Sequence, residues 1–254
     1  MKPVESVEHS CGIAVMAKAS APGRTKTRLS PPLTPREAAD FNTAFLKDVA
    51  ANLLSANDLL RGKPTSISPY MAFGPPGSEP FFEEICPVDV AFFEAWLPDF
   101  GACLFKATET LLAKGHDSAI VLNADSPTLP TALLAEAAEA LARPGDRAVL
   151  GPSNDGGYYL LGLKQAHHRL FEDISCSTER VFAQTVQRAS EIGLELHRLP
   201  AWYDVDDVAA LRLLHDELFV GGAFDTQMTP NAAMNTSELM KGLFDTSDLR
   251  ERIG

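Results

Sequence analysis

The chain has 254 residues, of which 45% are hydrophobic and 22% are charged, and its formal net charge is −12. These values are ordinary for a globular protein, and no segment reaches the roughly 18 apolar residues of a membrane-spanning helix. The negative charge disfavours a nucleic-acid polymer as a partner, although one local cluster of Lys and Arg can still bind a small phosphate. Residues 1–10 lack the basic-then-apolar order of a secretory signal, so we expect a cytoplasmic protein.

Apolar runs and helical spacings alternate along the chain. The first run, residues 12–17, predicts a buried strand, and Thr34 with Glu37 predicts the capping box of a long helix that has Pro35 in its first turn. Further strands are predicted at residues 65–73, 88–93, 118–125, 148–150, 158–163 and 194–199. Further helices are predicted around residues 105–115, 130–144, 178–192 and 207–218.

This alternation predicts an α/β fold with a mostly parallel sheet that helices cover on both faces. We expect a single domain over residues 1–219. Residues 220–254 are more polar and irregular, so they predict a peripheral tail with one short helix near residues 237–244.

The loop after the first strand, AKASAPGRTKTRL, has the residues of a phosphate-binding loop without being a P-loop. Gly23 would let the main chain approach an anion, while Lys26 and Arg28 supply positive charge. A P-loop needs Gly directly before its Lys, but Thr25 stands there. A solvated basic turn explains the same residues without any ligand.

Two acids follow predicted strands in the middle of the chain. Asp125 ends the clearest central strand, where a carboxylate suits Mg²⁺ or Mn²⁺, although capping of the next helix is an alternative. Asp155 precedes Gly156 and Gly157 in a turn. A hairpin explains those glycines without a ligand, whereas a loop that contacts substrate also explains the acid.

Three more acids precede the last predicted helix of the domain. Asp206 or Asp207 is expected to cap that helix. A cap does not account for all three, and Asp204 or Asp206 could share a metal ion with Asp125.

Four segments together resemble the landmarks of the DUF2064 family, which is grouped with the nucleotide-diphospho-sugar transferases of GT-A fold. In chain order they are AKASAPGRTKTRL, VLNADSPTLP, GPSNDGGYYLLGL and YDVDDVAALRLL, within about residues 12–218. The resemblance implies a three-layer α/β/α sandwich with a Rossmann-like sheet. It departs from the family where Phe100-Gly101-Ala102-Cys103 replaces a Leu-Gly-Glu-Arg-like element, and where Asn123-Ala124-Asp125 replaces a Gly-Ser-Asp-like step.

The resemblance also implies a role for each candidate residue. Nucleotide phosphates would bind at Gly23, Lys26 and Arg28. Mg²⁺ or Mn²⁺ would bind at Asp125, and Asp204 or Asp206 would complete its site. The loop that contacts the acceptor or the sugar would contain Asp155, Gly156, Gly157 and Tyr158.

We therefore expect a metal-dependent transferase whose donor is a nucleoside triphosphate or a nucleotide-sugar and whose acceptor is a small molecule. Asp125, through the metal, and Asp155, as a base for an acceptor hydroxyl, are the candidate catalytic residues. The alternative is a non-catalytic nucleotide- or metabolite-binding protein that keeps the fold. The altered element at residues 100–103 motivates that alternative.

Overall fold

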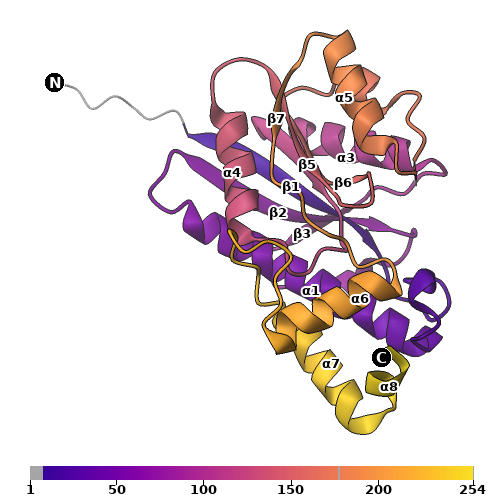
Figure 1. The fold of residues 1–254 in the computed structure, drawn as a ribbon. Helices are drawn as coiled ribbons and strands as arrows, with labels where there is room; N and C mark the ends of the chain where they lie inside the picture. The colour runs from indigo at the N-terminus through magenta and orange to yellow at the C-terminus, as the bar shows by residue number, and fades with distance from the viewer. Residues whose placement is uncertain (1–7, 177, 254) are drawn as a thin grey trace.

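A computed structural model describes residues 8–176 and 178–253, which form one seven-stranded sheet between two layers of helices (Figure 1). The strands are β1 (His9–Lys18), β2 (Thr65–Gly74), β3 (Ala91–Glu94), β4 (Ser118–Leu122), β5 (Arg147–Pro152), β6 (Tyr158–Leu163) and β7 (Glu195–Arg198). Their spatial order is β3-β2-β1-β4-β6-β5-β7. Among the strands of the described residues only β6 runs antiparallel to its neighbours, β4 and β5, so the expected mostly parallel sandwich is confirmed.

The helices divide between the two faces of the sheet. They are α1 (Pro35–Leu59), α2 (Glu79–Ile85), α3 (Phe100–Ala113), α4 (Thr131–Ala142), α5 (Val181–Glu191), α6 (Val208–His215), α7 (Met234–Thr246) and α8 (Leu249–Ile253), with short turns η1 (Thr27–Leu29), η2 (His168–Phe171) and η3 (Asp216–Val220). Helices α3 and α5 cover one face, and α1, α4 and α6 cover the other (Figure 1). No helix of the described residues is long and apolar enough to cross a bilayer.

Alternate residues of the central strands supply the two apolar layers. In β1, Ile13 and Val15 pack with α1, whereas Ala14 faces the opposite way toward α3. In β4, Ile120 and Val121 divide in the same way. Both faces of these strands are therefore buried. This is why the sequence shows them as continuous apolar runs rather than as an alternating pattern.

Local sequence signals predict the start of α1 but do not predict α2. The Thr34 side chain accepts a hydrogen bond from the Glu37 amide at 3.2 Å, and the Glu37 carboxylate accepts one from the Thr34 amide at 2.7 Å, so the predicted capping box is confirmed. The sequence predicts no helix between the strands at residues 65–73 and 88–93, yet α2 begins there at Glu79. Proline in the first turn of a helix loses no hydrogen bond, and the full burial of Phe82 holds α2 against the core.

The C-terminal segment is more ordered than its polar composition indicated. Helix α7 is longer than the helix expected at 237–244, and α8 follows it. The buried Asp48 of α1 accepts hydrogen bonds at 2.6–2.8 Å from the main-chain and side-chain groups of Asn235 and Thr236. Because this carboxylate satisfies amides at the start of α7, the segment is attached to the domain by buried polar contacts that a hydropathy pattern cannot reveal.

The register of the sheet brings the loops of interest to one edge. Strands β1 and β4 are parallel with Val15 opposite Leu122, so the loops that follow them emerge together. The antiparallel β6 starts at that edge with Leu160 opposite Leu122, which brings the β5–β6 turn there. β7 is parallel to β5, and the segment after it arrives at the same place.

The Asp48 contact gives a test of how the C-terminal helices are held. We expect Asp48→Asn to lower the free energy of unfolding by about 2–4 kcal/mol, because an amide cannot accept all four hydrogen bonds and places its own donors against N–H groups. Urea unfolding followed by circular dichroism measures the change. Asp40→Asn is the matched control on the same helix, where only a surface ion pair with Arg36 is lost and the change should be below about 0.5 kcal/mol. Equal losses of stability in the two variants would contradict the role of Asp48 in holding α7.

Candidate functional site

Lys26 is the residue at which the loops of the site converge. Its ammonium lies 2.7 Å from Asp125 Oδ1 and 2.9 Å from Asp206 Oδ1, and it donates to the Val205 carbonyl at 2.8 Å. The side chain is 5% exposed, whereas the two carboxylates are about one-third exposed. All three N–H donors of this buried cation are therefore used within the protein.

The local backbone turns the Lys26 side chain inward. Lys26 has φ 50°, an uncommon left-handed conformation for a residue with a side chain, and the turn η1 begins immediately after it. Burial opposes the charged ammonium, but the negative charges of Asp125 and Asp206 outweigh that effect and raise the pKa of Lys26. The group therefore stays protonated at neutral pH.

The other two residues of the predicted phosphate loop are exposed. Gly23 has φ 72°, and nothing would contact a β-carbon there, so its conformation rather than close packing requires glycine. The Arg28 side chain is 68% exposed, with Nη1 3.6 Å from Asp206 Oδ2. The structure thus brings Lys26 and Arg28 together with the predicted acids, whereas Gly23 is exposed and is not part of that cluster.

The acids after β7 have separate contacts. Asp204 Oδ1 accepts a 2.7 Å hydrogen bond from Ser153, on the β5–β6 turn. Burial, and then the negative charges of Asp155 and Asp206, raise the pKa of Asp204 above its usual value. Asp207 accepts a hydrogen bond from the Ala210 amide at 2.8 Å and caps α6, so of the two expected caps it is Asp207 that serves.

The backbone of the β5–β6 turn requires glycine at position 156 for structural reasons. Gly156 has φ 89°, and a β-carbon there would lie 2.3 Å from the Glu179 carbonyl, so the turn packs directly on that backbone. Asp155 accepts a hydrogen bond from the Gly157 amide at 2.8 Å, as in an Asx turn. Tyr158 follows at the start of β6, and burial raises the pKa of its phenol.

Two cavities meet at the Lys26 cluster. The larger one has a volume of about 510 Å³, and its wall includes Asp125, Asp155, Gly157, Tyr158, Asp204 and Asp206. The smaller one, of about 260 Å³, is lined by the cations Lys18, Arg24, Lys26 and Arg28. Arg28, Asp125 and Asp206 line both cavities and therefore separate a cationic compartment from an acidic one.

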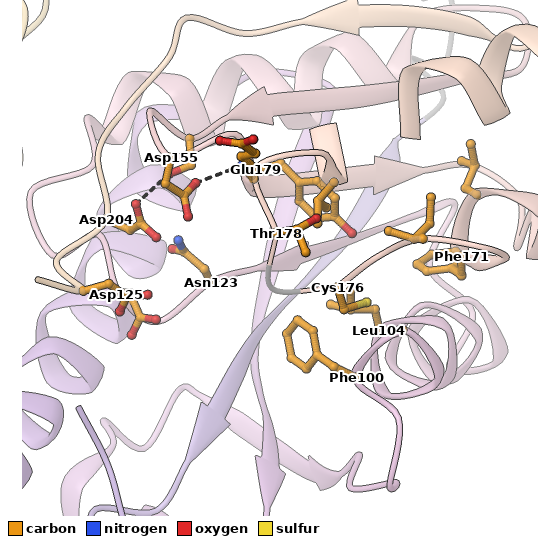
Figure 2. Close-up of a pocket in the computed structure, with 18 of the residues that line it drawn as sticks. Phe100, Leu104, Asn123, Asp125, Asp155, Phe171, Cys176, Thr178, Glu179 and Asp204 are labelled. Carbon is orange, nitrogen blue, oxygen red and sulfur yellow. Dashed lines mark hydrogen bonds between the residues drawn. The ribbon is translucent and has the colours of Figure 1, made fainter. Parts of the chain in front are cut away.

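Figure 2 shows how the larger cavity is divided. Asp125, Asp155 and Asp204 gather at one end with Asn123, whereas Phe100, Leu104 and Phe171 lie at the other. Sequence reasoning missed this apolar end and the contributions of Ser153, Lys18 and Arg24. The helical spacings around Phe105 and over residues 178–192 are the signals near the apolar end, but they do not show which side chains of α3 and α5 reach a cavity.

Within residues 8–176 and 178–253, no group of three or more His, Cys, Asp or Glu side chains is arranged to hold a metal ion. Asp125 and Asp206 share Lys26, while Asp204 bonds to Ser153. The structure thus brings two of the three predicted metal ligands onto a common cation. Lys26 binds Oδ1 of Asp125 and Oδ1 of Asp206, and Oδ2 of Asp206 lies 3.6 Å from Arg28 Nη1.

Comparison with known proteins agrees with this architecture. The family described as "Uncharacterized protein conserved in bacteria (DUF2064)" matches residues 61–178. No curated protein sequence is significantly similar to the chain. The crystal structure of a "putative nucleotide-diphospho-sugar transferase" from Desulfovibrio desulfuricans G20 is similar with a TM-score of 0.75 and 24% identity, over 96% of this chain and 97% of that one.

Two further solved structures share the fold at lower similarity. A cytidylyltransferase from Leptospira borgpetersenii serovar Hardjo-bovis has a TM-score of 0.54 and 12% identity, over 95% of this chain and 96% of that one. CMP:2-keto-3-deoxy-manno-octonic acid synthetase, complexed with CTP, has a TM-score of 0.50 and 12% identity, over 82% of this chain and all of that one. Residues 61–178 therefore match the DUF2064 family, and the chain has the fold shared by nucleotide-diphospho-sugar transferases and cytidylyltransferases.

Proposed function

We propose that this protein is a metal-dependent transferase that uses a nucleotide-activated donor, either a nucleoside triphosphate or a nucleotide-sugar. The observation that carries the proposal is the junction of a cationic and an acidic cavity at Asp125 and Asp206. The donor's phosphates would occupy the cationic cavity and the acceptor the larger one, so the reacting bond would lie at their shared wall.

The cationic cavity has the charge for a polyphosphate. Four cations line it, and its two carboxylates are those that Lys26 bridges. Arg28 offers an exposed guanidinium, which can bind phosphate oxygens through two hydrogen bonds, and Arg24 adds a second exposed one. Positive charge at this place stabilises a leaving pyrophosphate or nucleoside diphosphate in the transition state.

The carboxylates at the shared wall fit a hard divalent cation. Asp125 and Asp206 present oxygen ligands, each has an oxygen that Lys26 does not take, and both are open to the two cavities. Asp204 lies beside them and supplies a further carboxylate. Mg²⁺ or Mn²⁺, when bound, would neutralise charge on the donor phosphates.

The acceptor would approach from the larger cavity. In nucleotidyl transfer its oxygen forms a bond to the α-phosphorus while the bond to pyrophosphate breaks; in glycosyl transfer it bonds to the anomeric carbon while the nucleoside diphosphate leaves. In both reactions the hydroxyl loses a proton. Asp155 lines this cavity with an exposed carboxylate and is our candidate for accepting that proton.

A non-catalytic nucleotide-binding role is the second candidate. Phe100 and Gly101, of the element in which the family's Glu and Arg are replaced, line the larger cavity. Ala102 and Cys103, which stand where the family has Glu and Arg, bring no charged side chain to this element. Nucleotide binding without product from any acceptor tested would favour this second candidate.

Binding of the donor can be tested by thermal unfolding. With nucleotide near 100 times its dissociation constant and Mn²⁺ present, we expect the melting temperature to rise by about 5–10 °C. Asp125→Asn should abolish the metal-dependent part of this rise, because it removes one of the two anionic ligands at the shared wall. A panel of nucleoside triphosphates and nucleotide-sugars identifies the donor.

The control for this experiment is Asp245→Asn, an exposed carboxylate on α7 outside both cavities. It should respond to nucleotide and metal as the unchanged protein does. If no nucleotide on the panel raises the melting temperature of the unchanged protein, the proposed donor is wrong.

Removal of Lys26 tests the ion pairs that join the loops. Lys26→Met should lower the free energy of unfolding by about 1–3 kcal/mol at pH 7, less than for a fully buried pair, since both carboxylates are partly exposed. Because the pKa of Lys26 is raised on folding, this contribution should be fully present below about pH 10.4 and should shrink as the pH rises through the folded-state value. Urea titrations of both proteins between pH 6 and pH 11 measure the difference.

Arg28→Met provides the comparison within the same site. Its guanidinium is mostly exposed and 3.6 Å from Asp206, so the expected loss is below about 0.5 kcal/mol. A Lys26→Met difference as small as this, or one that grows with pH, would be incompatible with the bridging role of Lys26.

A further inference from the structure

The two ends of the larger cavity differ in chemistry: one is lined by apolar side chains and the other by carboxylates. Its apolar end consists of aromatic and aliphatic side chains from α3, η2, the following loop and α5: Phe100, Leu104, Leu170, Phe171, Ile174 and Val181. Leu104 and Leu170 are almost fully buried, whereas Phe100 is 54% exposed at the opening. A ligand that reaches this end must present apolar surface to it, since polar groups would lose hydration without finding partners.

The polar end is acidic. The described residues that line the cavity include five carboxylates and a single cation: Asp125, Asp155, Glu179, Asp204, Asp206 and Arg28. Arg28 lies on the wall shared with the cationic cavity, 3.6 Å from Asp206. A phosphate or carboxylate on a bound molecule would therefore meet no cation beyond that wall.

The hydrogen bonds of these acids support this description. Asp204 accepts from the neutral Ser153 hydroxyl and Asp155 from the Gly157 amide, so their negative charges face the cavity and disfavour a further anion there. A hydroxyl or an ammonium group, by contrast, can donate hydrogen bonds to Asp155 and Asp204. The rings of Phe100 and Tyr158 line the same cavity and suit the carbon skeleton of such a molecule.

We propose that the larger cavity selects an acceptor that has an apolar body and a neutral or cationic polar end, and that it excludes acceptors carrying phosphate or carboxylate. The inference rests on the proposed function only in naming the bound molecule an acceptor. The selectivity follows from the lining residues themselves. Under this assignment the substrate is an amphipathic alcohol or amino alcohol rather than an acidic or phosphorylated sugar.

Three small probes with the same ring test this selectivity: 2-phenylethylamine, 2-phenylethanol and 3-phenylpropionate. Their affinities for the full chain at pH 7.5, without nucleotide, are measured by ligand-observed NMR. We expect the amine and the alcohol to bind at least about tenfold more tightly than the carboxylate, because like charges placed together at a binding site are strongly unfavourable. A carboxylate that binds as well as the alcohol would overturn the proposal, as would three probes that all fail to bind.

Two variants show whether the probes occupy this cavity. Val181→Trp fills the apolar end and should abolish binding of the amine and the alcohol, whereas Val220→Trp, at a 69% exposed position outside the cavity, should leave it unchanged. Asp155→Asn, at an exposed position, should reduce the advantage of the amine over the carboxylate severalfold. Probe binding that survives Val181→Trp in a folded protein, or selectivity unaffected by Asp155→Asn, would contradict the proposal.

Nucleotide-induced thermal stabilisation, measured on the same samples, separates this inference from the proposed function. Stabilisation by nucleotide with the wrong probe selectivity would refute the acceptor class alone. The expected probe selectivity without any nucleotide effect would refute the donor and leave a binding site for amphipathic alcohols and amines.

Discussion

The buried ammonium of Lys26 holds the site together. It joins the loop after β1 to Asp125, in the loop after β4, and to Val205 and Asp206, which lie 179 and 180 positions further along the chain. The Val205 amide in turn donates to the Asp125 carbonyl at 2.8 Å. Three separate segments are therefore fixed to one another by charge and by main-chain hydrogen bonds.

The ion pairs of Lys26 lie between two cavities of opposite charge. The cations of the β1 loop line one cavity, and the acids that follow β5 and β7 line the other. The two carboxylates bound to Lys26 belong to both. The proposed transfer reaction and the proposed acceptor class both depend on this wall, since it keeps a compartment suited to phosphate apart from one that disfavours anions.

Sequence reasoning reached much of the fold because the signals were local. Buried parallel strands appear as short apolar runs, and the capping box of Thr34 and Glu37 satisfies main-chain groups within one turn of α1. The sequence patterns did not predict α2 or the extent of the C-terminal helices α7 and α8. Those depend on contacts between distant residues, such as the burial of Phe82 and the hydrogen bonds from residues 235 and 236 to Asp48.

The sequence by itself determined that Lys26, Arg28, Asp125, Asp155, Asp204 and Asp206 follow strands of an α/β sheet, where ligands usually bind. Only the tertiary structure decided that Lys26 binds Asp125 and Asp206, that Asp204 pairs with Ser153, and that α3, η2 and α5 give the cavity an apolar end. The physical reason is that strand register and the antiparallel course of β6 set which loop ends meet. Neither is encoded in the spacing of residues within one segment.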